Sequence, residues 1–366
     1  MTTASQRAPD FTGDEEAPDA QEGRKVGDEH GGPLVSVIIP IYDSGKTIWR
    51  VLESIAEIRF DTKKVEVILV YFPTQDEGLG IVESFIEAHR RDFESMTLLK
   101  RDDRRANVAR NMGIRASRGA YLFLLNDDVL VSPDSVANAI SILSQDKKVG
   151  VVTFPYVFEP PRIYEQAMFF RFFGRIARTK VFALGCSMVK REVFAKAGLI
   201  NEKMGPPLTS NDDYEISARV AKAGFAVTID GRTVMTDIGS LKEKEVAAKS
   251  TRGSARSIAG ALAKYVRYDT GVGADTYDLV LRPAPAAWKV EPLFYVAIFL
   301  LGVATSFYNL VYGVLYVVSV SVASILYFRA SRPVYALYSL LVVCRRISRS
   351  CGYVVRRGAK ALMKVL

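Results

Sequence analysis

The stretch that decides the fold is Ala120-Tyr-Leu-Phe-Leu-Leu-Asn-Asp-Asp128. Its first six residues form an apolar run of strand length, typical of a strand that a parallel sheet buries on both faces. Asn126, Asp127 and Asp128 cannot continue such a strand, so we expect the chain to turn out there into a site. Closely spaced carboxylates at this position suit a hard divalent cation shared with substrate phosphates, although an Asp-Asp pair is often only a turn or a helix cap.

Strands and helices alternate upstream of this stretch. Apolar runs predict three earlier strands, and helical spacing predicts three intervening helices: strands over 34–39 (closed by Pro40), 65–70 and 96–99, and helices over 46–58, 81–91 and 106–117. This alternation predicts an α/β domain with a mainly parallel sheet. Ligands of such sheets bind beyond the carboxyl ends of the strands, so the loops after Pro40, Val70 and Leu125 should share one edge.

A second acidic cluster, Thr209-Ser-Asn-Asp-Asp-Tyr-Glu215, leads into a helical stretch. Its three carboxylates either complement the dipole of the helix or include a general base that faces a cleft, and spacing leaves both readings open. The chain has only two histidines, His30 and His89. Because neither lies in a suitable setting, catalytic proton transfer must rest on carboxylates.

The charge of +9 is unevenly distributed. Residues 1–33 carry three basic and eight acidic side chains and few large apolar ones, so we expect a disordered acidic leader without a signal-peptide core. Residues 329–366 carry nine Lys or Arg and no acid. The cysteines Cys186, Cys344 and Cys351 form no disulfide or zinc pattern, which fits a reducing compartment.

Residues 292–328 form a run of 37 residues without a charge. One membrane crossing needs about 20 residues, so the run is long enough for two. Positive flanks place both ends in the cytoplasm, with the catalytic domain. The alternative is a buried soluble hairpin. We therefore expect five parts: a leader (1–33), a catalytic domain (34–240), a juxtamembrane linker (241–290), two transmembrane helices (291–328) and a basic interfacial tail (329–366) that binds anionic lipid, not nucleic acid.

At this point the chain resembles the GT-A fold, family 2 glycosyltransferases over about residues 34–240. The segments that carry the resemblance occur in the family's order: Val35-Ser-Val-Ile-Ile-Pro-Ile-Tyr-Asp43, Ala109-Arg-Asn-Met-Gly113, Arg118-Gly-Ala-Tyr-Leu-Phe-Leu-Leu-Asn-Asp-Asp128, Gly185-Cys-Ser-Met-Val-Lys-Arg-Glu-Val-Phe194 and Asn211-Asp-Asp-Tyr-Glu-Ile-Ser-Ala-Arg219. Each segment is loose alone, but their order and spacing together are specific.

The resemblance implies roles for particular residues. Asp128 would bind Mg²⁺ or Mn²⁺ on the donor diphosphate, and Asp213 would be the base with Asp212 as its acidic partner. The nucleotide-sugar donor would lie against Pro40, Tyr42, Asp76, Arg110, Asn126 and Asp127. Gly185 and Ser187 would lie on the acceptor side.

The chain departs from the family pattern at two places. After the second strand the family usually has Asp-Asp-Gly-Ser-x-Asp, whereas this chain has Tyr71-Phe-Pro-Thr-Gln-Asp76, so the nucleotide base would stack on Tyr71 or Phe72, or the donor is unusual. Where a metal-binding His often follows the acidic motif, this chain has Thr236 and Asp237. Asp237 is a candidate oxygen ligand, or it only orders the loop.

The expected activity is that of an inverting glycosyltransferase in glycan biosynthesis. A divalent cation neutralises a nucleoside diphosphate leaving group, and a carboxylate takes the proton of an acceptor hydroxyl. The membrane segment favours a polyprenyl phosphate, a lipid-linked glycan or another glycan as acceptor. The alternatives are a catalytically weak nucleotide-sugar-binding scaffold and a nucleotidyltransferase, which would lack a reason for Asp212 and Asp213.

Overall fold

The computed structural model describes residues 34–160, 169, 172–205 and 211–241, and further along the chain 293, 295–304, 316, 318–320, 322 and 347. The expected leader, nearly all of the linker and the basic tail, and most of the charge-free run lie outside these residues. The expected catalytic domain lies almost entirely within them.

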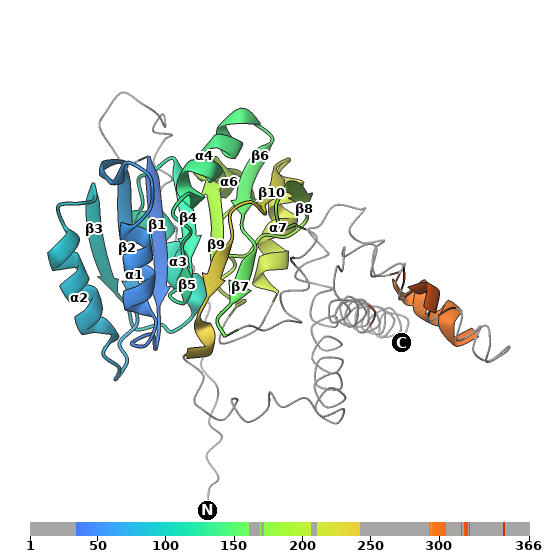
Figure 1. The fold of residues 1–366 in the computed structure, drawn as a ribbon, viewed down its shortest axis with the longest axis horizontal. Helices are drawn as coiled ribbons and strands as arrows, with labels where there is room; N and C mark the ends of the chain where they lie inside the picture. The colour runs from blue at the N-terminus through green and yellow to red at the C-terminus, as the bar shows by residue number, and fades with distance from the viewer. Residues whose placement is uncertain are drawn as a thin grey trace, which may run out of the picture. The chain divides into compact units, whose positions relative to one another are not determined.

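An eight-stranded sheet forms the centre of this domain, in the order β3-β2-β1-β4-β9-β6-β10-β8 (Figure 1). The first four strands are parallel: β3 (Ser95–Lys100), β2 (Val65–Tyr71), β1 (Val35–Ile41) and β4 (Tyr121–Leu125). β9 (Cys186–Lys190) runs antiparallel between β4 and β6 (Val149–Thr153). β10 (Ala226–Asp230) is parallel to β6, and β8 (Ile176–Thr179) closes the edge antiparallel to β10. The expected α/β class with a mainly parallel sheet is confirmed.

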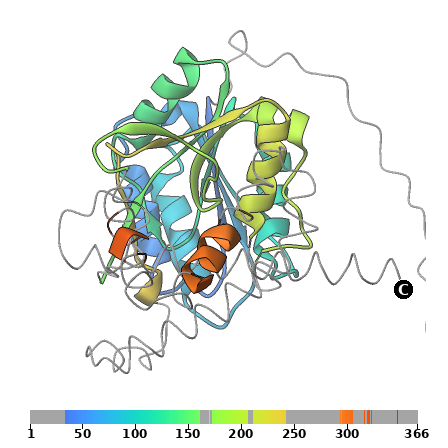
Figure 2. The ribbon, with the colours of Figure 1, turned by 90° about the vertical axis from the view of Figure 1, so that its right-hand side faces the viewer.

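Helices cover both faces of the sheet (Figure 2). One buried cluster joins one set of strand side chains to α1 (Ile48–Ala56), α2 (Gly78–His89) and α4 (Ser135–Gln145). A second cluster joins other strand side chains to α3 (Ala106–Ala116), α6 (Arg191–Ala197) and α7 (Asp212–Lys222). Every residue of β1 and β2 is buried, because side chains that alternate along these strands meet helices on both sides.

A small second sheet has the order β5-β11-β7 and consists of β5 (Val129–Leu130), β11 (Met235–Asp237) and β7 (Tyr156–Phe158). Asp237 lies opposite Val129, and the Ile238 amide donates to the Asp128 carbonyl over 2.8 Å. Two short 3₁₀ turns complete the fold: η1 (Thr62–Lys64) and η2 (Gly239–Leu241). The small sheet brings the segment after β4 beside a segment more than a hundred residues later.

A buried carboxylate ties together the amino-terminal ends of the central strands. Glu66 is 3% exposed and accepts hydrogen bonds from the Ser36 hydroxyl (2.6 Å) and from the Arg118 amide (2.5 Å) and guanidinium (3.2 Å). A buried charge persists only when it is paired and hydrogen-bonded in this way. Glu66 therefore stabilises the edge of the sheet opposite the strands' carboxyl ends.

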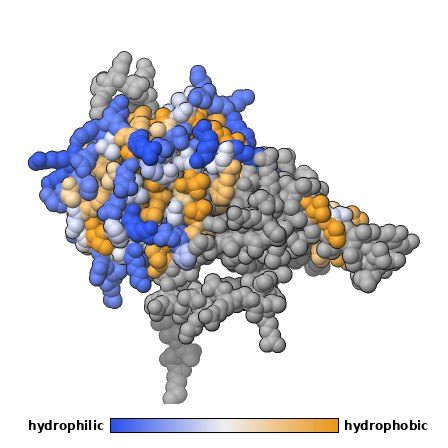
Figure 3. Space-filling model, in the orientation of Figure 1, coloured by the Kyte–Doolittle hydropathy of each residue, from blue (hydrophilic) through white to orange (hydrophobic). Residues whose placement is uncertain are grey.

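Among the described residues, no helix has the length and apolar character needed to cross a membrane. Residues 295–304 are helical, as are 316, 318–320 and 322, and the Tyr316 hydroxyl donates to the Ile298 carbonyl. Large apolar side chains of these residues are exposed, Leu300 at 58% and Leu301 at 57% among them. Figure 3 shows the resulting apolar surface on this segment.

Candidate active site

The loops after β1, β2 and β4 meet at the carboxyl ends of the parallel strands, as the alternation of strands and helices predicts. The Tyr42 amide donates to Asp127 Oδ2 over 2.9 Å, which joins the first loop to the Asn-Asp-Asp segment. The Gly45 amide donates to Asp76 Oδ2 over 2.6 Å, which joins the first loop to the second. Pro40 itself is buried within β1, so it shapes the loop from inside the sheet.

The three polar residues after β4 point to three different partners. The Asn126 side-chain oxygen accepts a hydrogen bond from Arg110 Nη2 (2.8 Å). The Asn126 backbone amide donates to the Gly185 carbonyl (2.9 Å). Asp127 is 7% exposed and holds the Tyr42 amide. Asp128 turns the other way, toward Gly239. Of these three side chains, only that of Asp128 is therefore directed toward the small sheet.

Asp128 and Asp237 face the same glycine. A Cβ atom on Gly239 would lie 2.9 Å from Asp128 Oδ2 and 3.1 Å from Asp237 Oδ1, so only a glycine leaves both carboxylates room. Thr236 neighbours Asp237 in β11, and neighbouring side chains of a strand point to opposite faces. The carboxylate, rather than the hydroxyl, is thus the group beside Asp128.

This pair of carboxylates fits a divalent cation of the Mg²⁺ type. Such ions use one or two protein carboxylates and complete their shell with water and substrate phosphates. Within the part of the chain that the structure describes, no three His, Cys, Asp or Glu side chains are grouped as an all-protein metal cage. Asp128 and Asp237 would therefore hold the ion jointly with the donor diphosphate.

Two aromatic rings and a guanidinium form a slot beside the first loop. The Tyr42 ring is 45% exposed and lies 5.5 Å from the Phe72 ring, centroid to centroid. The Arg101 guanidinium lies over the Phe72 ring, 5.9 Å from its centroid, and its buried Nε atom has no hydrogen-bond partner among the residues that the structure describes. Tyr71 is only 2% exposed and bonds Thr74, so of the two expected stacking residues only Phe72 can meet a nucleotide base.

Asp76 orders the second loop. Burial alone would raise its pKa, but hydrogen bonds from the Thr74 hydroxyl and the amides of Gly45 and Gly78 outweigh burial and leave the pKa below its ordinary value. Its Oδ1 atom lies 2.5 Å from Thr74 Oγ1. Both oxygens of Asp76 thus accept hydrogen bonds from the protein, and the residue holds the first and second loops together.

Helix α7 begins with the expected acidic motif. Asn211 adopts a left-handed conformation (φ 75°) just before the helix, and the Leu184 amide donates to Asp213 Oδ1 over 2.9 Å. Burial, together with the neighbouring charge of Asp212, raises the pKa of Asp213 to about 7. Glu215 instead pairs with Arg219 over 2.7 Å. Of the three carboxylates, Asp212 and Asp213 are therefore the ones directed to the sheet.

Arg110 lies inside the protein rather than in an open nucleotide pocket. It is 6% exposed; Nη1 donates to Asn107 Oδ1 (2.7 Å) and lies 3.9 Å from Asp212 Oδ2, while Nη2 bonds Asn126. Asn107 in turn donates to Asp212 Oδ2 over 3.2 Å. Burial lowers the pKa of Arg110, with Asp212 opposing, and an arginine remains protonated under such a shift. Arg110 thus links the end of β4 to the start of α7.

Sequence reasoning missed Asn107 and Gly205. Asn107 lies one helical turn before Arg110, a spacing at which two helical side chains meet. The sequence could therefore have indicated that these two residues are in contact. A Cβ atom on Gly205 (φ 81°) would lie 2.5 Å from Asn107 Nδ2 and 2.6 Å from Asp212 Oδ2. The contact between Gly205 and Asp212 had no counterpart in the sequence pattern.

The two expected acceptor-side residues have structural partners. A Cβ atom on Gly185 would lie 2.2 Å from Asn126 Cγ, so the glycine makes room for that side chain. Ser187 is fully buried in β9 and its hydroxyl donates to the Ala183 carbonyl over 2.6 Å. Both residues are buried, and Leu184, which precedes them, is the residue of this segment that contacts Asp213.

The fold places the chain in a structural class. The solved mannosyltransferase PcManGT from Pyrobaculum calidifontis, in complex with GDP-Man and Mn²⁺, matches with a TM-score of 0.55 and 20% identity, over 88% of this chain and 87% of that chain. At this identity the likeness shows the fold alone. The chain has an α/β, GT-A-like fold with a mostly parallel central sheet.

Residues 36–198, a little under half of the chain, match the family described as Glycosyl transferase family 2. Glycosyltransferase AglE of Haloferax volcanii is 27% identical over 208 residues, covering 54% of this chain and 64% of AglE. Glycosyltransferase GlyG of Streptococcus pneumoniae is 28% identical over 119 residues, covering 32% of this chain and 38% of GlyG. The chain spans less than two thirds of the length of either relative. These matches support the resemblance to family 2 glycosyltransferases over this segment.

Proposed function

We propose that this protein is an inverting glycosyltransferase that moves a sugar from a nucleotide-sugar donor to a membrane-associated acceptor. The observation that supports this most is the meeting of two acidic groups, Asp128 with Asp237 and Asp212 with Asp213, around the end of β4. The pair of Asp128 and Asp237 suits a donor diphosphate and its cation. The pair of Asp212 and Asp213 suits an acceptor hydroxyl. PcManGT is solved with GDP-Man and Mn²⁺, which supports a donor and an ion of these kinds.

The chain's own residues would divide the work as follows. Tyr42 and Phe72 stack the nucleotide base, and Asp128 and Asp237 hold a Mg²⁺ or Mn²⁺ ion. When bound, the ion stabilises the negative charge that develops on the leaving diphosphate. Asp213 accepts the proton of the acceptor hydroxyl, whose oxygen attacks the anomeric carbon on the face opposite the leaving group, so the configuration inverts.

Asp213 is suited to proton transfer because its pKa of about 7 lies near the operating pH. The Leu184 amide fixes one oxygen of the carboxylate, which leaves the other for the acceptor. Asp212, held by Asn107 and near Arg110, lies beside Asp213 and raises its pKa, which favours the protonated form that the reaction produces.

The acceptor and the membrane belong to the same proposal. The charge-free run over 292–328 with its positive flanks favours two crossings and a cytoplasmic catalytic domain. Two described helical pieces of this run contact each other through Tyr316, which meets Ile298 and Gly302, and they expose apolar side chains. These features support a helical hairpin in lipid, an acceptor at the membrane surface such as a polyprenyl phosphate or a lipid-linked glycan, and a basic tail on anionic lipid.

The proposal is tested by measuring sugar transfer by the purified protein in the presence of Mn²⁺, with a panel of UDP- and GDP-sugars as donors and a lipid extract as acceptor. We expect Asp213→Asn to lower turnover by roughly 10²–10⁴ for a hydroxyl acceptor and to leave donor affinity nearly unchanged. A polyprenyl phosphate is already ionised, so a loss of a few-fold would identify that acceptor. Donor binding without transfer or hydrolysis would instead identify a nucleotide-sugar-binding scaffold and refute the proposal.

A further inference from the structure

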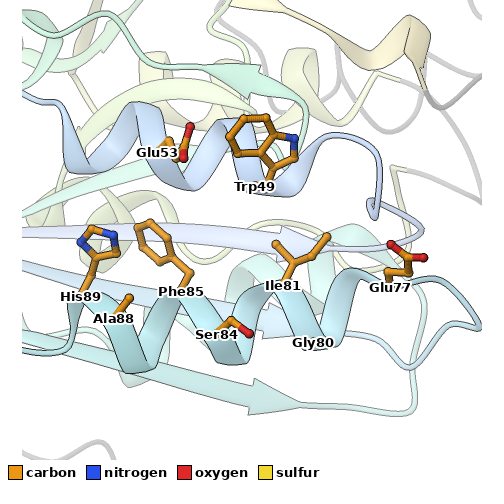
Figure 4. Close-up of a pocket in the computed structure, with 9 residues that line it drawn as sticks. All are labelled: Trp49, Glu53, Glu77, Gly80, Ile81, Ser84, Phe85, Ala88 and His89. Carbon is orange, nitrogen blue, oxygen red and sulfur yellow. The ribbon is translucent and has the colours of Figure 1, made fainter.

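A groove runs between α1 and α2 on the outer face of the domain (Figure 4). The groove is shallow and open to solvent, and its volume is about 520 Å³. Nine residues line it: Trp49, Glu53, Glu77, Gly80, Ile81, Ser84, Phe85, Ala88 and His89. None of them takes part in the site described above.

The two walls of the groove follow from helical spacing. Trp49 and Glu53 lie one turn apart on α1, beside the buried stripe of Ile48, Val51, Leu52 and Ile55. Ile81, Phe85 and His89 lie one turn apart on α2, and Figure 4 shows them projecting toward α1. Core packing does not require the exposed indole, since 47% of Trp49 is open to solvent.

The groove offers flat apolar faces. Besides Trp49, the rings of Phe85 and His89 stack with centroids 4.3 Å apart. The His89 ring is held in place by Asp92, whose Oδ2 atom lies 2.8 Å from Nδ1. The rings are therefore fixed surfaces, which lose little freedom when a ligand covers them.

Two carboxylates complete the lining, and both lack an ionic partner among the described residues. On the other faces of α2, Glu83 pairs with Lys100 and Glu87 with Arg90. Glu53 and Glu77 make no such pair in the described chain, and none of the nine lining residues is a Lys or Arg. The lining thus offers no cationic partner to a phosphate or another anion, but it presents two carboxylates as acceptors to hydroxyl groups.

From this combination we infer that the α1–α2 groove is a second, non-catalytic binding site for a neutral glycan chain. A pyranose ring has an apolar C–H face that covers an aromatic ring, and hydroxyl groups around its rim that donate to carboxylates. The site would hold the enzyme on a glycan-bearing surface while transfer takes place at the sheet edge. The inference rests on the proposed function, because that function is what brings the protein to glycans.

The groove also adjoins the donor side of the domain. Glu77 follows Asp76, whose carboxylate holds Gly45 of the first loop, and a Cβ atom on Gly45 would lie 3.3 Å from the Glu77 amide. A glycan in the groove would therefore end beside the loops that surround the nucleotide slot without entering that slot.

The experiment uses full-length protein in a detergent without a sugar headgroup, in a Trp288→Phe background that leaves Trp49 as the only indole. The probes are maltohexaose, cellohexaose, chitohexaose and mannohexaose, with a hyaluronan hexasaccharide as the anionic control. We expect at least one neutral probe to change Trp49 emission, and saturating UDP or GDP with Mn²⁺ to leave that binding unchanged. By calorimetry, Trp49→Ala should weaken it at least about tenfold, or about 1.4 kcal/mol.

Matched variants separate contact from folding. Glu53→Gln should weaken binding, whereas Glu57→Gln, an exposed carboxylate that caps the carboxyl end of the same helix outside the lining, should not. Trp49→Ala should bind UDP or GDP as the parent does, which shows that the domain is folded and keeps the proposed function and the groove distinguishable. Absence of binding by all four neutral probes, or equal binding by Trp49→Ala, overturns the inference. Trp49-dependent binding of a synthetic 329–366 peptide in place of sugars would assign the groove to a cationic segment.

Discussion

Asp213 should make the folded domain less stable as the pH rises, and Asp213→Asn should remove this dependence. The folded protein holds the Asp213 proton up to about pH 7, whereas the unfolded chain releases it near the ordinary pKa of 3.8. Between these two pH values the folded state binds more protons, so raising the pH lowers the free energy of unfolding. The difference of about 3 pH units, at about 1.4 kcal/mol each, corresponds to roughly 4 kcal/mol as an upper value.

The assay is urea unfolding of wild type and Asp213→Asn in parallel at pH 5, 6, 7 and 8, followed by Trp49 fluorescence in the Trp288→Phe background. Asn resembles protonated aspartic acid in shape and can still accept from the Leu184 amide. The variant should therefore already be the more stable at pH 5, and its advantage should grow up to about pH 7 and then level off. Other titrating groups cancel in the comparison. A difference that stays constant from pH 5 to 8 would refute the argument that burial and Asp212 hold the proton on Asp213.

Other predictions concern the donor side, the packing of β9 and the membrane topology. Asp128→Ala should abolish, and Asp237→Ala weaken, the Mn²⁺-dependent binding of UDP or GDP measured by calorimetry; unchanged affinity in both would contradict the shared cation site. Gly185→Ala should lower stability by about 1–3 kcal/mol in urea unfolding, because its Cβ would lie 2.2 Å from Asn126 Cγ, while Gly80→Ala, with nothing within 4 Å, should not. Reporter fusions at the two termini should both be cytoplasmic, and an external C-terminal reporter would exclude two crossings.

The first half of the sheet could be predicted because its signals are local. The run from Leu34 to Ile39 predicted a buried strand, and β1 is buried along its whole length. The helix expected from Ile81 begins at Gly78, where polar and glycine residues hide the helical spacing. The position of β9 between β4 and β6 could not be read from the sequence, because strand pairing over such distances depends on packing rather than on local pattern.

The site was predicted in its composition but not in its contacts. Spacing placed Asp212, Asp213 and Glu215 together, but which carboxylates face the sheet depends on Leu184 and on Arg219, and helical spacing cannot decide between them. Arg110 was expected beside the nucleotide, yet its guanidinium is buried inside the protein, where it donates hydrogen bonds to Asn107 and Asn126. Its partner after β4 lies sixteen residues away, across a turn whose path no local rule fixes.

Leu184 and Gly185 are adjacent in the chain, and each serves a different part of the site: one amide anchors Asp213, and the next carbonyl anchors the strand end at Asn126. Two consecutive residues of fixed length therefore set how far apart Asp213 and the end of β4 stand. Inserting or deleting a single residue here would displace both at once, so this segment should tolerate almost no change in length. A chimaera that exchanges loops around this site should therefore be joined outside residues 183–187, so that the spacing between Asp213 and Asn126 is kept.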